Sequence, residues 1–515
     1  MQKKQTFLYN ALLLIGVSLA MRTIGMYFNV YISNKVGAEA MGVYSLISGI
    51  YGFGITLATS GINLAVTRLV SQASGENKTA SPKTIMRMCL LHAAFFGMLA
   101  FILLFSLSEF IAYYWLDDIR TIMPLKILAA SLPFIALSSA LNGYFTAIRK
   151  AYKNAVTVFA EQLIKIFISI FLLLKILPDG IEYACISLAL GSLGAEFISF
   201  LSITFLYIKD KISKSSKIRN IKLSLSRYRI YDLLSITLPI AFSSYIRSGL
   251  LSIEHSLIPV GLRKFGASYE TSLASYGTLQ SMVFPTILFP AVFLTSFSSL
   301  LVPELSENQA TGNNDKIKNI ISKTIRITLV FGIGTAGIIF CFADELGNIL
   351  YSTSPTAGIY MAMMAPLIPI MYLDSMTDVM LKGLGQQFYS MVINIVDSFL
   401  SVILVWIIVP KFGVLGYITI IYGCELINAT LSIARLIAVS QLKIDIINWI
   451  LKPLAATVGA ISIIRIVSKI FIETYNSFYL CIAIICTIVI YLLLLLGLFA
   501  ILPNEIKLLK HKIKS

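Results

Sequence analysis

Two arginines, Arg22 and Arg247, lie inside long apolar segments, where a permanent charge is costly. Arginine stays charged and can hold phosphate oxygens through two parallel hydrogen bonds. A polar residue follows each arginine after seven positions, about two helical turns: Asn29 follows Arg22, and Glu254 follows Arg247. This pattern predicts a site for an anionic group inside the membrane. Two alternatives remain for Glu254: a structural pair with Arg247, or a switch that releases Arg247 in one state.

Three further polar residues are candidates for contacting the same ligand. Arg68 lies near the end of an apolar segment, where it either captures an anionic headgroup or extends its charge to the membrane surface. Asn63 and Gln280 lie within apolar segments and could hydrogen-bond sugar hydroxyls. The candidate ligand therefore combines an anionic group with hydroxyl groups.

Three carboxylates, Asp374, Asp378 and Asp397, also lie within apolar segments. Asp374 and Asp378 are four residues apart and share one helix face. They could bind a coupling Na⁺ or H⁺, or they could compensate the charge of the arginines. We expect no resident cofactor, with the driving force coming from such an ion or from the membrane potential.

The residues for metal binding and enzyme catalysis are not arranged in recognisable patterns. All six cysteines fall within apolar segments, and no CxxC or Cys/His spacing occurs, so neither a disulfide framework nor a metal site is expected. A membrane glycosyl polymerase or ligase would need a long extracytoplasmic loop with catalytic carboxylates or histidines. No loop of that kind is predicted, so we expect a protein that is not an enzyme.

Composition and apolar run length predict the elements that carry these residues. Of the 515 residues, 57% are hydrophobic and only 13% are charged, against about 25% charged residues in a typical soluble domain. Apolar runs long enough to cross a bilayer as helices recur along the chain. We expect an all-α polytopic membrane protein with fourteen transmembrane helices, near residues 7–32, 43–67, 85–110, 124–147, 155–177, 183–208, 232–260, 274–302, 321–343, 357–381, 388–410, 414–440, 453–472 and 477–502.

Basic residues are concentrated in alternate connecting loops. The basic set includes the N-terminal MQKK, the segment 209–231 and the C-terminal KLLKHKIKS, whereas the opposite set carries the acidic pairs Asp117–Asp118 and Asp344–Glu345. The positive-inside rule then places both termini in the cytoplasm of a multi-pass plasma-membrane protein. The net charge of +16 is explained by topology and membrane lipids rather than by nucleic acid.

The first half of the chain recurs in the second. LIGVSLAMR at 14–22 matches LPIAFSSYIR at 238–247, and LPFIALSSALNGYFTAIRK at 132–150 matches IPIMYLDSMTDVMLKGLGQ at 368–386. Offsets stay between 225 and 236, which predicts two parallel six-helix lobes related by an axis along the membrane normal. We expect residues 1–208 and 232–440 to form the lobes, 209–231 a basic cytoplasmic loop, 441–502 two additional helices, and 503–515 a basic cytoplasmic tail.

A duplicated bundle is typical of a transporter in which one lobe rocks against the other. Arg22 and Arg247 are equivalent in the repeat, so they are expected to face each other across a central cleft. A single polypeptide supplies both lobes, and we expect a monomer.

Several motifs resemble one transporter family. QTFLYNALLLIGVSLAMRTIG at 5–25, SGINLAVTRLVS at 60–71, PIAFSSYIRSGLLSIEHSLIP at 239–259 and FPAVFLTSFSSLLVPELSE at 289–307 carry the resemblance. In them the chain resembles the multidrug/oligosaccharidyl-lipid/polysaccharide exporter superfamily, in its fourteen-span polysaccharide-flippase branch.

The resemblance implies outward flipping of an undecaprenyl-diphosphate-linked oligosaccharide or peptidoglycan precursor, for cell-wall, spore-cortex or polysaccharide synthesis. It also implies that the two C-terminal helices form a groove for the lipid tail, and that wall-synthesis enzymes are candidate partners. One departure is clear. Lipid II flippases of this branch carry several cavity arginines on their first, second and eighth spans, whereas Phe28 and Gln280 stand here where further basic residues would be expected.

Two alternative functions remain open. A cation-coupled multidrug exporter would share the two lobes, although the additional two helices and the paired arginines favour the flippase. A non-transporting scaffold of the wall-synthesis machinery would tolerate loss of Arg22 and Arg247.

Overall fold

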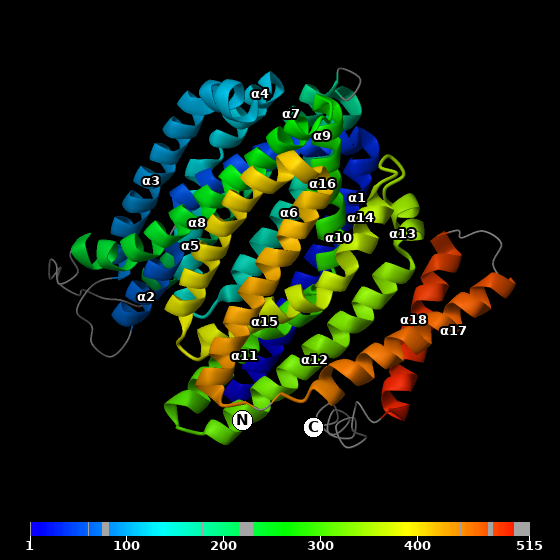
Figure 1. Ribbon diagram of the computed structural model, residues 1–515. Coiled ribbons are helices and arrows are strands. Elements are labelled where there is room, and N and C mark those ends of the chain that lie inside the picture. Colours follow the sequence, from blue (N-terminus) through cyan, green and yellow to red (C-terminus); the bar gives the residue numbers. More distant parts are fainter. Residues whose placement is uncertain are drawn as a thin grey trace. The chain divides into compact units, whose positions relative to one another are not determined.

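The computed structural model describes residues 2–59, 61–74, 82–176, 180–215, 230–442, 444–471 and 477–498. These residues are almost entirely helical, and no strand occurs among them (Figure 1). Their contacts divide the chain into two compact units. Unit 1 comprises residues 1–28 and 39–277, and unit 2 comprises residues 29–38 and 278–515. Most of the predicted basic loop, the whole C-terminal tail and the N-terminal Met1 lie outside the described residues.

Unit 1 is built from long helices joined by short 3₁₀ and π segments. Its elements are α1 (Gln2–Thr59), α2 (Ile62–Ser74), α3 (Pro82–Phe110), η1 (Ile111–Leu116), η2 (Ile119–Thr121), α4 (Ile122–Ala129), α5 (Leu132–Ala147), α6 (Ala151–Ile176), α7 (Ile181–Ser215), α8 (Ile230–Phe265) and α9 (Tyr269–Gly277).

Unit 2 has the same character and also holds the α1 segment 29–38. Its other elements are η4 (Thr278–Val283), α10 (Phe284–Leu288), α11 (Val292–Ala310), α12 (Asn314–Cys341), α13 (Ala343–Leu350), α14 (Ala357–Met364), η5 (Ala365–Leu367), α15 (Ile368–Gly383), α16 (Gln387–Ser440), η6 (Ile447–Leu451), α17 (Lys452–Phe471) and α18 (Ser477–Gly497).

Membrane-spanning character is confirmed for the described part of the chain. Nine of its helices are long and apolar enough to cross a bilayer, and up to eleven if each of two bent helix pairs is one span. Two of the nine, Gly16–Gln72 and Gln387–Ser440, contain 57 and 54 residues, well beyond the roughly 20 residues that one span needs. The all-α polytopic fold is therefore confirmed, whereas the count of fourteen spans stays a prediction.

Glycines interrupt both of these very long helices. The backbone of α1 leaves helical geometry at Gly37 (φ 84°, ψ 170°), and that of α16 does so at Gly413 (φ 59°, ψ −140°). Positive φ is open to glycine because it lacks a Cβ atom. The predicted spans 388–410 and 414–440 lie on either side of Gly413, and the predicted spans 7–32 and 43–67 lie on either side of Gly37.

Helices in unit 1 approach one another closely at small residues. Gly143 of α5 lies against α2, where an added Cβ would come within 2.7 Å of the Asn63 carbonyl oxygen. Gly42 of α1 lies against the Leu273 carbonyl of α9, and Gly49 lies against His255 of α8. These contacts place α8 and α9 in the same compact body as α1, although the sequence repeat assigns them to the second lobe.

The two last helices pack on α12 within unit 2. They lie side by side (Figure 1), and the Tyr491 hydroxyl of α18 donates to the Val330 carbonyl at 2.7 Å. Arg465 of α17 donates to the carbonyl of Cys341 at 3.2 Å, at the end of α12 where carbonyl groups lack helical partners. Their outer faces are strongly apolar, with Phe478 and Leu493 each more than 60% exposed.

Candidate functional site

Arg22 and Arg247 are exposed side chains in the middle of helices. Both belong to unit 1, Arg22 on α1 and Arg247 on α8. Among the described residues, neither guanidinium has a hydrogen-bond or ion-pair partner. Each guanidinium has five N–H donors and no acceptor, so both side chains can bind an anion without first breaking a protein contact.

The packing of α8 explains why Arg247 is exposed. One face of α8 contacts the second half of α1: the Tyr245 hydroxyl donates to the Leu57 carbonyl at 3.2 Å, and the Ser252 hydroxyl donates to the Gly49 carbonyl at 2.9 Å. Arg247 lies two residues after Tyr245, off this packed face, since a helix turns by 3.6 residues. The local fold therefore fixes the backbone of Arg247 while leaving its side chain available.

Asn29 and Glu254, which follow the two arginines by two helical turns, have different surroundings. The Asn29 amide donates to the Ser281 carbonyl at 2.8 Å, and both residues belong to unit 2. Glu254 is half-buried in unit 1 and interacts electrostatically with the buried Tyr276 hydroxyl. The boundary between the units crosses α1 after Phe28, so Arg22 and Asn29 belong to different units. Asn29 thus has a structural hydrogen bond that periodicity does not reveal.

Asn63 and Arg68 are polar residues of α2 in unit 1. Both side chains are exposed, and the Asn63 amide donates to the Ser139 carbonyl of α5 at 3.1 Å. The Thr67 hydroxyl, between them, donates to the Gly143 carbonyl at 3.2 Å. Arg68 has no hydrogen-bond or ion-pair partner among the residues that the structure describes. These contacts anchor α2 on α5 and leave the Arg68 charge available.

Gln280 is half-buried in unit 2, within the π-helical segment η4. In a π-helical segment the backbone hydrogen bonds join residues five positions apart instead of four, and such segments are frequent at functional sites. The neighbouring Thr278 hydroxyl is bonded to the Ser354 hydroxyl at 2.7 Å, and Thr286 to the Tyr351 hydroxyl at 3.0 Å. Hydroxyl pairs therefore support the helix on both sides of Gln280.

The three candidate aspartates of unit 2 separate into two environments. Asp374 and Asp397 lie close enough to Glu425 to interact with it electrostatically, so α15 and both halves of α16 contribute to one acidic cluster. Asp378 instead accepts hydrogen bonds from Lys382, at 2.5 Å, and from Ser390. Within the described ranges, no group of three His, Cys, Asp or Glu residues is arranged to hold a metal ion.

Two polar networks of unit 1 were not predicted from the sequence. One surrounds buried Asp210, which accepts hydrogen bonds from the Tyr144 hydroxyl at 2.9 Å and from Lys150 at 2.5 Å. The other joins Glu39, Arg120 and Arg263 at the opposite end of the unit. Sequence reasoning used these charges only to assign loops to one side of the membrane. Their contacts join residues 60 to 152 positions apart, which periodicity cannot reveal.

Comparisons with known proteins give the context of this arrangement. Residues 7–262 match the family described as polysaccharide biosynthesis protein, and residues 266–407 match the MatE family. The chain is 27% identical to stage V sporulation protein B of Bacillus subtilis (strain 168), over 82% of each chain. It is 21% identical to the lipid II flippase MurJ of the same organism, over 84% of this chain and 86% of that protein.

A solved structure is similar over almost its whole length. The lipid II flippase MurJ in an inward closed conformation superposes with a TM-score of 0.72, covering 94% of this chain and 98% of that chain at 16% sequence identity. At this identity the similarity shows a common fold.

Proposed function

This chain belongs to the polysaccharide-flippase branch of the multidrug/oligosaccharidyl-lipid/polysaccharide exporter superfamily, and we propose that it flips an undecaprenyl-diphosphate-linked saccharide outward across the plasma membrane. It is a multi-pass membrane transporter, not an enzyme. Cell-wall, spore-cortex or polysaccharide synthesis would use the flipped product. The proposed orientation has both termini in the cytoplasm.

The observation that carries this proposal is the pair of unpaired arginines. Arg22 and Arg247 are exposed within apolar helices and lack partners among the described residues. A charge held in that environment without a counter-ion is costly, so a ligand that supplies the counter-charge is the simplest reason for it. A diphosphate suits two guanidiniums because each can bind two phosphate oxygens. Arg68 and Asn63 would extend this contact toward the sugar.

The prenyl chain would stay in lipid. The exposed apolar faces of α17 and α18 provide a surface on which such a chain can lie, and Phe478 and Leu493 are among its most exposed residues. Only the polar headgroup would then cross the low-dielectric layer in contact with protein.

We further propose that the acidic cluster of unit 2 couples transport to a cation. Asp374 and Asp397 each repel Glu425 within apolar helices, so binding of H⁺ to one of these carboxyl groups would relieve the repulsion. We assign this role to the cluster rather than to Asp378, because Asp378 already pairs with Lys382. The cation gradient that drives transport would therefore act through unit 2.

The decisive experiment is to delete the gene in its host and identify the lipid-linked saccharide that accumulates. Mass spectrometry of extracted lipids should show an undecaprenyl-diphosphate-linked saccharide in excess, protected from reagents outside the cell. Wild-type protein should remove the excess, whereas Arg22→Ala and Arg22→Lys should not, although both reach the membrane in normal amounts.

Two outcomes would contradict the proposal. One is the absence of any accumulated lipid-linked saccharide. The other is full complementation by both Arg22 variants when a truncated protein fails to complement, which is the behaviour of a scaffold.

A further inference from the structure

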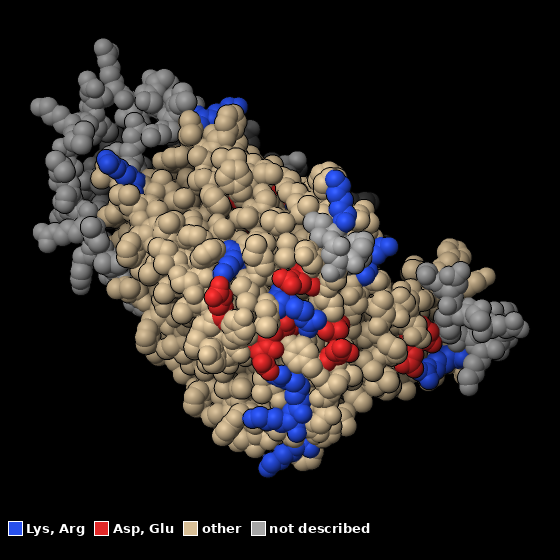
Figure 2. All heavy atoms as spheres, turned by 90° about the horizontal axis from the view of Figure 1, so that it is seen from above, with Lys and Arg blue, Asp and Glu red and all other residues tan. Residues whose placement is uncertain are grey.

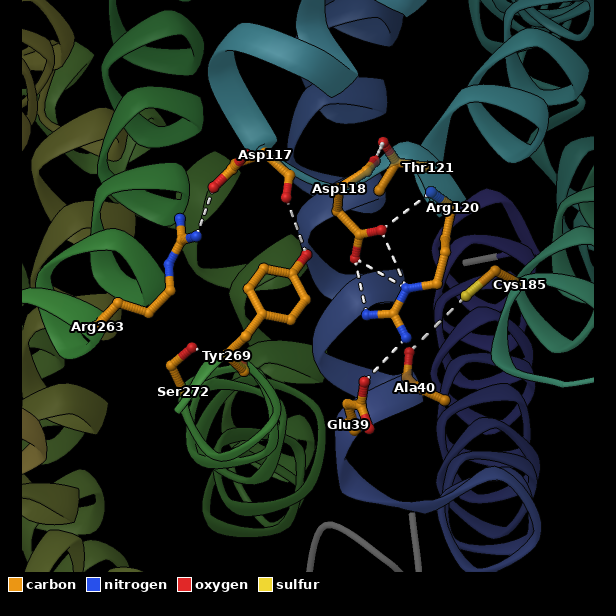
Figure 3. A network of polar contacts seen from close by, with 10 residues as sticks. All are labelled: Glu39, Ala40, Asp117, Asp118, Arg120, Thr121, Cys185, Arg263, Tyr269 and Ser272. Carbon is orange, nitrogen blue, oxygen red and sulfur yellow. Dashed lines mark hydrogen bonds and ion pairs between the residues drawn. The ribbon is translucent and has the colours of Figure 1, made fainter. Parts of the chain in front are cut away.

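One end of unit 1 carries a continuous network of charged and aromatic side chains (Figure 3). It joins three places in the chain: α1, the turn between η1 and η2, and the junction of α8 with α9. Its members are Glu39, Asp117, Asp118, Arg120, Arg263 and Tyr269. Under the proposed orientation, this end faces the exterior.

The inner part of the network centres on Arg120. Its Nε donates to Asp118 Oδ1 at 3.0 Å, and its Nη2 donates to Asp118 Oδ2 at 3.0 Å. Its Nη1 donates to Glu39 Oε1 of α1 at 2.9 Å. The Asp118 side chain is only 3% exposed, so Arg120 is its necessary counter-charge. One arginine therefore fixes the turn and ties it to α1.

The outer part joins the same turn to α8 and α9. Asp117 Oδ2 accepts a hydrogen bond from Arg263 Nη1 at 2.6 Å, and the Asp117 carbonyl accepts one from the Tyr269 hydroxyl at 3.1 Å. Asp117 has a left-handed backbone (φ 53°), and Figure 3 shows the two adjacent aspartates pointing toward different arginines. A single turn thus supplies carboxylates to both parts.

The ring of Tyr269 connects the two parts. The Cζ atom of Arg120 lies 5.7 Å from the ring centroid, and that of Arg263 lies 5.2 Å from it. Both distances are within the range of a cation–π contact. Tyr269 therefore contacts both guanidiniums and holds the η1–η2 turn through its hydroxyl.

The charges of the network neutralise one another almost completely. Three carboxylates meet two guanidiniums, and all five charges have a partner of opposite sign. Figure 2 shows acidic and basic side chains side by side near the middle of the face seen from above. The charges at this end of unit 1 therefore stabilise contacts within the protein and do not form an anion-binding site.

We propose that this network is a latch that keeps the end of unit 1 closed and must separate before the saccharide leaves the protein. The proposal rests on the transport function proposed above. Asp117 and Arg120 belong to the first sequence repeat, whereas Arg263 and Tyr269 belong to the second. Rocking of one repeat against the other cannot preserve contacts between them in both states.

The strength of the latch suits repeated opening. The Asp117 side chain is 66% exposed, so its pair with Arg263 is screened by water and is individually weak. Arg120 and Glu39 are about a quarter exposed. The Asp117–Arg263 pair, which crosses between the repeats, is thus weak, whereas the strong Asp118–Arg120 pair stays within one turn.

A native cysteine lies directly beneath the latch and can report its opening. Cys185 is 1% exposed, and its Sγ lies 3.9 Å from the Ala40 carbonyl, one residue beyond Glu39 (Figure 3). Arg120 shields this side of α1 while Tyr269 and Glu39 hold its guanidinium, so loss of these two contacts would admit water to the Cys185 thiol. A thiol reagent in water would then label it.

The test is maleimide labelling of full-length protein in lipid nanodiscs, where both membrane faces are accessible. Peptide mass spectrometry reads the labelling rate of Cys185 alone. Glu39→Gln, Arg263→Gln and Tyr269→Ala should each accelerate labelling about two- to fivefold, as expected for loss of a partly exposed pair. Arg120 is left intact because its removal would strand buried Asp118 and could unfold the turn.

A matched control is available at the same end of the unit. Lys126 pairs with Glu109 at 2.7 Å and joins α3 to α4, and neither residue is a member of the latch. Lys126→Gln should therefore leave the labelling rate of Cys185 unchanged. Combining Asp117→Arg with Arg263→Asp should return the rate to that of the wild type, since the reversed pair restores the attraction.

Equal labelling rates in the wild type and the three latch variants would overturn the latch. Acceleration by Lys126→Gln equal to that by Arg263→Gln would overturn it as well. Neither measurement uses a saccharide, so the latch can fail while the flippase proposal stands, and the flippase proposal can fail while the latch stands.

Discussion

Removing the exposed arginines should weaken ligand binding without weakening the fold. Arg22 and Arg247 have no partner among the described residues, so truncation to alanine leaves no carboxylate unpaired. An arginine near the middle of a membrane helix is itself unfavourable, by about 2.5–3.5 kcal/mol on insertion scales. Arg22→Ala and Arg247→Ala should therefore unfold at the same temperature as the wild type or higher.

The loss of affinity follows from the contacts that a diphosphate would make. Hydrogen bonds to charged groups contribute about 1.5–3 kcal/mol, which corresponds to roughly a 10- to 150-fold change in the dissociation constant. Arg22→Lys keeps the charge but loses bidentate geometry, and should weaken binding by about tenfold. Native mass spectrometry of detergent-solubilised protein, titrated with an undecaprenyl-diphosphate-linked saccharide, measures these constants directly.

A paired arginine provides the matched control. Arg435 donates to the Gln386 side chain at 2.6 Å and lies 4.9 Å from the centroid of the Tyr389 ring. Arg435→Ala should lower the free energy of unfolding by about 1–3 kcal/mol, while the affinity for the saccharide stays at the wild-type value. The reasoning is refuted if Arg22→Ala and Arg247→Ala bind the saccharide like the wild type, or if they lose as much stability as Arg435→Ala.

Three further outcomes are expected. Flipping in proteoliposomes should lose its dependence on a Na⁺ or H⁺ gradient in Asp374→Asn and in Asp397→Asn, but should keep it in Asp378→Asn. Retention of this dependence in both Asp374→Asn and Asp397→Asn would argue against a role for the acidic cluster in coupling. Gly413→Ala should cost about 1–3 kcal/mol in thermal unfolding, since its φ of 59° with ψ of −140° excludes other residues. Gly42→Val should cost a similar 1–3 kcal/mol, measured in the same way, because its side chain would collide with the Leu273 carbonyl. Gly52→Ala, with nothing within 4 Å of the added Cβ, should leave the stability unchanged or raise it by up to about 1 kcal/mol.

Hydrophobic run length predicted the helices well where each run formed one straight element. The predicted spans 155–177 and 321–343 fall on α6 and α12, because an apolar run of about 20 residues can satisfy its backbone in lipid only as a helix. The count was harder to predict. Hydropathy separated the apolar runs on either side of Gly37 and Gly413, but it does not predict the backbone dihedrals at these glycines (φ 84° and 59°).

The candidate site was predictable only in part. Arg22 and Arg247 could be identified from the sequence, because a charged residue inside an apolar run can be recognised without knowledge of its tertiary contacts. Bonds such as Asn29 to Ser281, or Arg263 to Asp117, join residues 252 and 146 positions apart and depend on tertiary packing. The sequence repeat and the compact units also divide the chain at different residues, since similarity of sequence defines a lobe and density of contacts defines a unit.

The α1 segment 29–38 has a consequence for biosynthesis. Asn29 donates to the carbonyl of Ser281, and Asn34 donates to the carbonyl of Leu350 at 2.6 Å, so their partners are translated 252 and 316 residues later. An amide without a partner in lipid is unfavourable, so this part of the first-made helix stays unsatisfied until α13 has emerged from the ribosome. A nascent chain stopped at Gly277 would therefore contain a first helix that is inserted but not yet stably placed, and thus open to quality-control proteolysis.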